Sequence, residues 1–134
     1  MPARTGQEYI EAISAADITV EIHGERTTGK VAEIQAFKNL IQTYAGLYDL
    51  QHEPGLRDVM TYDSPTTGER VGTSFLQPTT SEDLVRRRLM MEVWARSSNG
   101  MLGRTGDYLN AAIMAMAGAA DWFAQADAQY GSNI

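Results

Sequence analysis

The order of apolar and polar residues along the chain predicts a mainly helical protein. Apolar residues return every three to four positions in four stretches, which is the spacing of a helix with one buried face. We therefore expect four main helices, over residues 5–16, 34–51, 80–97 and 109–130. The first begins with the capping-box pattern T-G-Q-E, and the third begins with Thr, Ser and two acidic residues.

A small β-hairpin is predicted between the first two helices. Residues 18–22 alternate apolar and polar side chains, Gly24 and Glu25 offer a turn, and residues 26–31 can form the returning strand. The expected fold class is therefore mainly α, with four main helices and one small hairpin in a single domain over residues 1–134.

A long connection separates the second and third helices. Residues 56–60 can add one short helical turn, and the Thr-, Ser-, Gly- and Pro-rich residues 62–78 can hold a loose hairpin around Thr67 and Gly68. Long loops in compact domains are often functional, so this segment is of interest in its own right.

Two features of the last two helices carry further expectations. Three consecutive arginines at 86–88 are expected to point into solvent and pair with acidic residues elsewhere. The final helix is apolar nearly all round, so we expect it to be buried on most sides and to need more protein to pack against. The chain is therefore predicted to be part of a larger protein.

Charge and composition exclude several classes of function. The chain has 17 acidic and 11 basic residues and a formal net charge of −6, which disfavours a nucleic-acid partner. The longest uncharged apolar stretch, residues 108–120, is shorter than the about 20 residues that a membrane span needs. The N-terminus shows no signal-peptide pattern, so a soluble cytoplasmic protein is expected. The lack of cysteine excludes disulfides, thiolate metal sites and cysteine nucleophiles.

The loop over residues 100–108 is the best candidate for chemistry. It has a glycine at every third position, and glycines let a ligand approach the backbone. Arg104 adds a planar fork of donors that suits a carboxylate or a phenolate. Thr105 or Asp107 can cap the last helix, and the Tyr108 hydroxyl can point to the same place. The alternative is an ordinary turn between helices, with Arg104 in a structural salt bridge.

The rest of the sequence offers little catalytic chemistry. His23 and His52 have no second histidine or carboxylate at the spacing of metal ligands, so no metal site is expected. No phosphate-binding loop and no serine–histidine–aspartate pattern is present in the sequence.

Several motifs, taken together, resemble one family. They are T-G-Q-E-Y-I at 5–10, I-x-G-E-R at 22–26, A-F-K-N at 36–39, L-Y-D-L-Q-H at 47–52, M-T-Y-D-S-P-T-T-G at 60–68, S-F-L-Q-P at 74–78, S-E-D-L at 81–84 and W-A-R-S-S-N-G-M-L-G-R-T-G-D-Y at 94–108. In this order and spacing they resemble the N-terminal region of the 4-hydroxyphenylacetate 3-hydroxylase oxygenase family. The last motif is the most specific of them.

The resemblance implies a fold and a function. It implies the helical N-terminal domain of an acyl-CoA-dehydrogenase-like fold, in a longer three-domain oxygenase. Such proteins are flavin-dependent monooxygenases that take reduced FAD from a separate flavin reductase and hydroxylate a phenol ortho to its hydroxyl. The resemblance also suggests a homotetramer, with the main FAD-binding segments beyond residue 134. The isolated chain is expected to be inactive.

The resemblance also assigns site residues. In the family's G-R-(S/T)-P-D-Y loop the arginine and the tyrosine bind the phenol, and these roles fall on Arg104 and Tyr108 as catalytic residues. The expected substrate-binding residues are Arg104, Thr105, Gly106, Asp107 and Tyr108. Gly106 stands where the family has proline, which keeps the loop's length. A second departure is the I-Q-A-F sequence at 34–37, where the family has H-P-x-F.

Alternatives to this interpretation remain open at the level of sequence. One is a stand-alone, non-catalytic domain that packs against partner chains through its apolar last helix. Another keeps the fold but takes a chlorophenol or a peptide-derived tyrosine as substrate. The related 4-hydroxybutyryl-CoA dehydratases carry iron–sulfur cysteines near residues 99–103, and the lack of cysteine argues against that branch.

Overall fold

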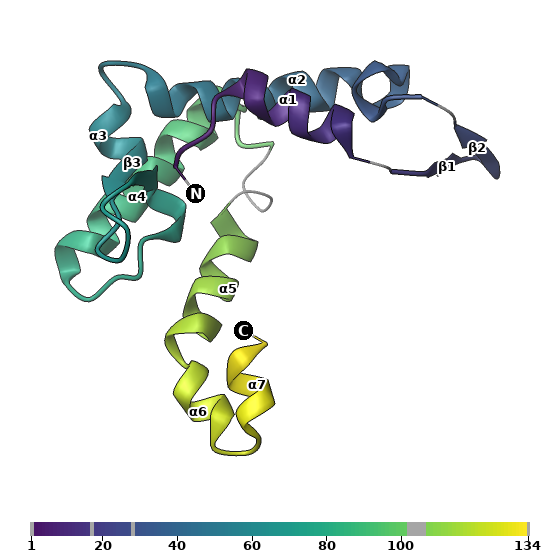
Figure 1. The fold of residues 1–134 in the computed structure, drawn as a ribbon. Coiled ribbons are helices and arrows are strands. Elements are labelled where there is room, and N and C mark those ends of the chain that lie inside the picture. The colour runs from purple at the N-terminus through teal and green to yellow at the C-terminus, as the bar shows by residue number, and fades with distance from the viewer. Residues whose placement is uncertain (1, 17, 28, 102–106, 134) are drawn as a thin grey trace. The chain divides into compact units, whose positions relative to one another are not determined.

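The computed structural model describes residues 2–16, 18–27, 29–101 and 107–133 (Figure 1). The chain divides into two compact units, Pro2–Arg57 and Asp58–Ile134. Each unit is described by itself below. That residues 1–134 form a single domain stays a prediction.

The first unit consists of two helices and a short antiparallel hairpin. Its elements are α1 (Gly6–Ala15), β1 (Val20–Ile22), β2 (Glu25–Thr27), the 3-10 turn η1 (Val31–Glu33), α2 (Gln35–Asp49) and the 3-10 turn η2 (Leu50–His52). The predicted first helix, first hairpin and second helix are confirmed. The hairpin turns at His23 and Gly24, which both have positive φ, at 54° and 84°.

Helix α1 begins where the capping-box pattern predicts and packs against α2. The Thr5 side chain accepts a hydrogen bond from the Glu8 backbone N–H, and the Glu8 carboxylate accepts one from the Thr5 backbone. The Gly6 N–H donates to Asp49 Oδ1 at 2.7 Å, which ties the start of α1 to the end of α2. The Tyr9 ring stacks on Tyr48 with ring centroids 4.9 Å apart.

The approach of α1 to α2 is close enough to require glycine at position 6. A Cβ atom on Gly6 would lie 2.5 Å from the Ala45 carbonyl oxygen, which is backbone and cannot move alone. We expect Gly6→Ala to lower the free energy of unfolding by about 1–3 kcal/mol, measured by urea denaturation. Gly46→Ala in α2 is the matched control, because an added Cβ there meets nothing within 4 Å. That control should be stabilising by about 0.5–1 kcal/mol, and a change of the same sign and size in both variants would contradict the account.

The second unit combines a hairpin with the helices of the C-terminal half. Its elements are α3 (Arg57–Met60), which starts at the unit boundary, β3 (Thr61–Asp63), β4 (Arg70–Gly72), the 3-10 turn η3 (Thr73–Phe75), α4 (Ser81–Ser97), α5 (Asp107–Gly118), α6 (Ala120–Ala124) and α7 (Ala128–Ser132). Strands β3 and β4 are antiparallel, with Tyr62 opposite Val71. The loose hairpin expected around Thr67 and Gly68 is therefore present as a second ordered hairpin.

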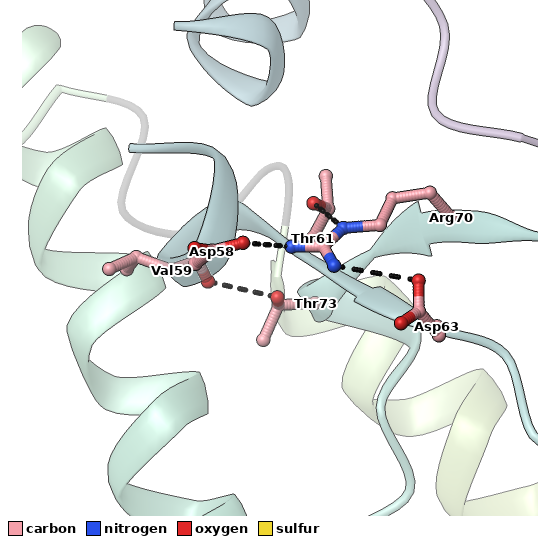
Figure 2. A network of polar contacts seen from close by, with 6 residues as sticks. All are labelled: Asp58, Val59, Thr61, Asp63, Arg70 and Thr73. Carbon is pink, nitrogen blue, oxygen red and sulfur yellow. Dashed lines mark hydrogen bonds and ion pairs between the residues drawn. The ribbon is translucent and has the colours of Figure 1, made fainter. Parts of the chain in front are cut away.

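A network of polar contacts joins this second hairpin to α3 (Figure 2). Arg70 Nε donates to Thr61 Oγ1 at 2.8 Å across the two strands, and the guanidinium also pairs with Asp58 and Asp63. The Thr73 hydroxyl donates to the Val59 carbonyl at 2.9 Å. The hairpin, α3 and the start of η3 are thus held together by directional bonds.

Arg70 is therefore expected to matter for stability more than an ordinary surface arginine. Its side chain is only 30% exposed and it bonds to three different residues. Arg70→Ala should lower the free energy of unfolding by about 1 kcal/mol, a value reduced by its partial exposure to solvent. The control is Arg96→Ala, whose side chain is 79% exposed in a pair with Glu92, and it should cost at most about 0.5 kcal/mol in the same denaturation experiment. Equal losses would mean that the network adds nothing.

Helix α4 has the start that the sequence predicts. The Thr80 side chain accepts from the Asp83 N–H, and the Asp83 carboxylate accepts from the Thr80 backbone. The hydrogen bond from the Thr79 backbone is the largest cause that holds the pKa of Asp83 below its ordinary value, and the Thr80 side chain adds to it. This capping contribution is lost as the pH falls through the lowered pKa, because the protonated carboxyl is a poorer acceptor.

The prediction for the arginine run is wrong at its middle residue. Arg88 is exposed, but Arg87 is buried, with 7% of its surface exposed. The reason is that Arg87 lies three residues before Met90, which is completely buried, so both face the interior of the unit. The hydrogen bonds that satisfy Arg87 there are described with the candidate site.

The expectation of one long final helix is also wrong. The helical stretch is interrupted after Gly118, where Ala119 has φ −107° and ψ 14°, and again before Asp127, which caps α7. Gly118 has low helix propensity, and a Cβ there would lie 2.5 Å from the Gln77 side chain. The chain turns back after α6, so that α6 and α7 lie side by side (Figure 1).

Burial of the last helical segment differs from the expectation as well. The side chains of Leu109, Ile113 and Met116 are spaced along one face of α5, yet these residues are 59%, 57% and 47% exposed. The prediction that this segment is buried on most sides is therefore wrong for the described chain. The spacing instead gives α5 an apolar face that is open to solvent.

Candidate functional site

The core of the predicted site lies outside the described residues. Arg104, Thr105 and Gly106 belong to the segment 102–106, so their predicted roles are not tested by the structure. Asp107 and Tyr108 are the first two residues of α5, and only their helical backbone is described. The assignment of these five residues as catalytic and substrate-binding stays a prediction.

The described residues before the loop show how α4 ends. The Gly100 N–H donates to the Ala95 carbonyl at 2.8 Å, and the Ser98 hydroxyl donates to the Trp94 carbonyl at 2.8 Å. Asn99 and Gly100 both have positive φ, at 50° and 75°, which is the left-handed conformation that commonly closes a helix. The predicted stop at S-S-N-G is confirmed, and the candidate loop therefore runs from this closed helix end to the start of α5.

The start of α5 is suited to a negatively charged group by general principle. The N–H groups of a first helical turn are free of helical partners, and the helix dipole favours an anion near them. In this chain the sequence places an arginine three residues before the first residue of α5.

One segment with three buried residues, Thr73, Ser74 and Leu76, packs against α5. This segment is η3 and the residues that follow it, the S-F-L-Q-P motif of the sequence. Arg87 of α4 donates through Nη1 to the carbonyl oxygens of Ser74 and Leu76, at 2.8 and 3.0 Å. Ser74 is only 4% exposed, and its Oγ accepts a hydrogen bond from Asn110 Nδ2 at 3.0 Å.

Sequence reasoning missed this arrangement of Arg87, Ser74 and Asn110. A signal for Arg87 existed, because residues 87, 90 and 94 are spaced as one face of a helix, and the apolar Met90 and Trp94 mark that face. The hydrogen bond between Ser74 and Asn110 joins residues 36 positions apart in the sequence, and no local sequence pattern predicts such a distant contact.

Tyr62 is a second polar group close to η3. Its hydroxyl donates to the Phe75 carbonyl at 3.3 Å. Burial raises the pKa of the Tyr62 phenol above its ordinary value, and the nearby Arg86 and Arg87 oppose this only in part. Tyr62 is therefore neutral at physiological pH and acts as a hydrogen-bond donor that supports η3.

The described residues contain neither a candidate metal cluster nor a helix that could span a membrane. No group of three or more His, Cys, Asp or Glu side chains that could hold a metal ion occurs in residues 2–16, 18–27, 29–101 and 107–133. In the same part of the chain no helix has the length and apolar character needed to cross a membrane.

The mainly helical fold of the described residues defines a class of protein, the helical N-terminal region of an acyl-CoA-dehydrogenase-like fold. The structure is similar, with a TM-score of 0.83 and 45% sequence identity, to the oxygenase component (HpaB) of 4-hydroxyphenylacetate 3-monooxygenase complexed with FAD. The likeness covers 90% of this chain and 25% of that chain, and it confirms the predicted fold class.

Residues 5–134 match the family model described as 4-hydroxyphenylacetate 3-hydroxylase N terminal, and the chain belongs to this family. It is 47% identical over 133 residues to the 4-hydroxyphenylacetate 3-monooxygenase oxygenase component of Geobacillus sp. (strain PA-9), covering 99% of this chain and 26% of the relative. It is 45% identical over 123 residues to the component of the same name from Thermus thermophilus, covering 92% of this chain and 25% of the relative. The chain spans about a quarter of the length of these relatives.

Proposed function

We propose that this chain is the N-terminal domain of a longer, reduced-FAD-dependent oxygenase that hydroxylates a phenol such as 4-hydroxyphenylacetate. The observation that carries the proposal is the match of residues 5–134 to the family, together with 45–47% identity to oxygenase components of that name. A solved structure at 45% identity holds both FAD and 4-hydroxyphenylacetate. A stand-alone, non-catalytic domain is not favoured by these relatives.

The role proposed for this chain is to bind and orient the phenol. Arg104 and Tyr108 bind the ring hydroxyl, and Thr105, Gly106 and Asp107 line the same pocket. Transfer of oxygen to an aromatic ring is electrophilic, so the electron-rich phenolate is the better reactant. A fixed guanidinium next to the phenolate oxygen stabilises that form, and the start of α5 adds a smaller effect of the same sign.

The overall reaction balances with one molecule of oxygen. One oxygen atom replaces the ring hydrogen ortho to the hydroxyl, and the other leaves as water. Reduced FAD, when bound, supplies the two electrons, and it comes from a separate flavin reductase. No residue of this chain is assigned to the flavin, because the main binding segments are expected beyond residue 134. A homotetramer in the cytoplasm is part of the same proposal.

A second candidate substrate is a phenol tethered to a carrier protein. The chain is 31% identical over 119 residues to a (3S)-3-amino-3-(3-chloro-4-hydroxyphenyl)propanoyl-[peptidyl-carrier protein SgcC2] monooxygenase from Streptomyces globisporus. The higher identity to the 4-hydroxyphenylacetate enzymes favours the free acid as substrate.

The proposal is tested with the full-length protein that carries this chain. Chemically reduced FAD, oxygen and 4-hydroxyphenylacetate should give 3,4-dihydroxyphenylacetate, detected by chromatography. The matched control is 4-methoxyphenylacetate, which cannot form a phenolate and should give no hydroxylated product. If oxygen is consumed and no phenol of the panel is hydroxylated, including a chlorinated and a carrier-tethered one, the proposed function is wrong.

A further inference from the structure

We propose that Ser74 and Asn110 are positioning residues of the phenol site. Their hydrogen bond sets the place and rotation of the first part of α5, the helix that begins with Asp107 and Tyr108. This inference rests on the proposed function, because it assigns a purpose to the tie only if Tyr108 contacts the substrate.

Ser74, the acceptor of this hydrogen bond, lies in the 3-10 turn η3, which is hydrogen-bonded to its surroundings. Ser74 is 4% exposed and its neighbour Thr73 is completely buried. The Ser74 carbonyl accepts from Arg87 at 2.8 Å, and the Thr73 hydroxyl donates to the Val59 carbonyl at 2.9 Å. Hydrogen bonds with two other elements, α4 and α3, therefore hold η3, and with it the acceptor Ser74 Oγ.

Two large apolar residues near Asn110 on α5 do little to hold the helix in place. Leu109 and Ile113, which flank Asn110 on α5, are 59% and 57% exposed, so they contribute little burial within the described chain. A hydrogen bond is directional, and it defines a rotation about the helix axis that a smooth apolar contact does not. Asn110 and Tyr108 lie in the same helical turn, so a shift of one moves the other.

Such a shift has consequences for a reaction that needs an oriented substrate. An error of about 1 Å in a positioning group can cost on the order of 100-fold in rate. A phenol that is loosely held binds more weakly, and it is also hydroxylated in a smaller fraction of the turnovers that consume oxygen. Loss of the tie should therefore raise KM and lower the yield of product per oxygen, whereas a loss of stability alone changes neither.

The test compares Ser74→Ala, Asn110→Ala and the double variant in the full-length protein. Each single change should raise KM for 4-hydroxyphenylacetate about tenfold and at least halve the product formed per oxygen consumed. The double variant should match the single ones, because both changes remove the same bond. Arg70→Ala is the control, since it removes polar contacts in the same unit that involve neither Ser74 nor Asn110, and it should leave KM and yield as in the wild type.

The outcomes separate this inference from the proposed function. If the two alanine variants behave like Arg70→Ala, or if their effects add in the double variant, the positioning role is wrong. If the wild-type protein hydroxylates no phenol, the proposed function is wrong. The effect of the Ser74–Asn110 hydrogen bond on α5 is then measured by hydrogen–deuterium exchange. In that experiment the backbone amides of residues 111–114 should exchange faster in Asn110→Ala than in Arg70→Ala, and equal rates would overturn the inference.

Discussion

Arg104→Ala in the full-length protein should lower kcat/KM for 4-hydroxyphenylacetate by about 100- to 1,000-fold. Removing one preorganised donor from a group that stabilises a developing or fixed negative charge typically costs this much. The guanidinium is proposed to hold the phenol as phenolate, so its loss removes both binding and activation of the ring. The measurement is a steady-state assay of hydroxylated product at several phenol concentrations.

The size of the effect depends on geometry as well as charge. Arg104→Lys keeps the positive charge but loses the planar fork of donors, so it should regain only part of the activity. Lys38→Ala is a suitable control, because it removes a positive charge from α2 with no role in the proposed site. An Arg104→Ala variant with wild-type kcat/KM would show that Arg104 does not bind the phenol. The loop would then be interpreted as an ordinary turn between helices.

Arg87→Met should lower the free energy of unfolding by about 1.5–3 kcal/mol. Arg87 is 7% exposed, and its Nη1 donates to two backbone carbonyls, which the variant would leave without this donor in a buried place. Removing a charged donor from buried carbonyl acceptors has effects of this size. The measurement is urea denaturation of the same protein at constant pH.

Arg88→Met is the control from the same run of arginines. The Arg88 side chain is 70% exposed, and its pair with Glu92 has a separation of 4.0 Å. Its replacement should change the free energy of unfolding by no more than about 0.5 kcal/mol. If Arg88→Met were as destabilising as Arg87→Met, the buried hydrogen bonds would not be the cause.

Elements with local signals were predictable from the sequence. Helices α1 and α4 begin at capping boxes, and such boxes need only four consecutive residues. The first hairpin follows from alternation around a glycine, and α2 follows from its apolar period. These features depend on neighbours in sequence, so they are present before any tertiary contact forms.

Features set by distant contacts were not predictable in the same way. Arg87 looked like one of three solvated arginines, and its burial depends on carbonyls 11 and 13 residues away. The interruption after Gly118 coincides with close approach of Gln77, which lies on another segment. The candidate loop was found through glycine spacing and a resemblance to a family. The family is now shown, and the roles of residues 104–108 remain predictions.

The central claim is that this chain supplies the phenol-binding residues of a flavin-dependent hydroxylase. The most direct test is a crystal structure of the full-length protein with FAD and 4-hydroxyphenylacetate. We predict the ring hydroxyl within hydrogen-bond distance of the Arg104 guanidinium and the Tyr108 hydroxyl, about 2.7–3.2 Å between heavy atoms. A bound phenol that touches no residue between Arg104 and Tyr108 would contradict the claim.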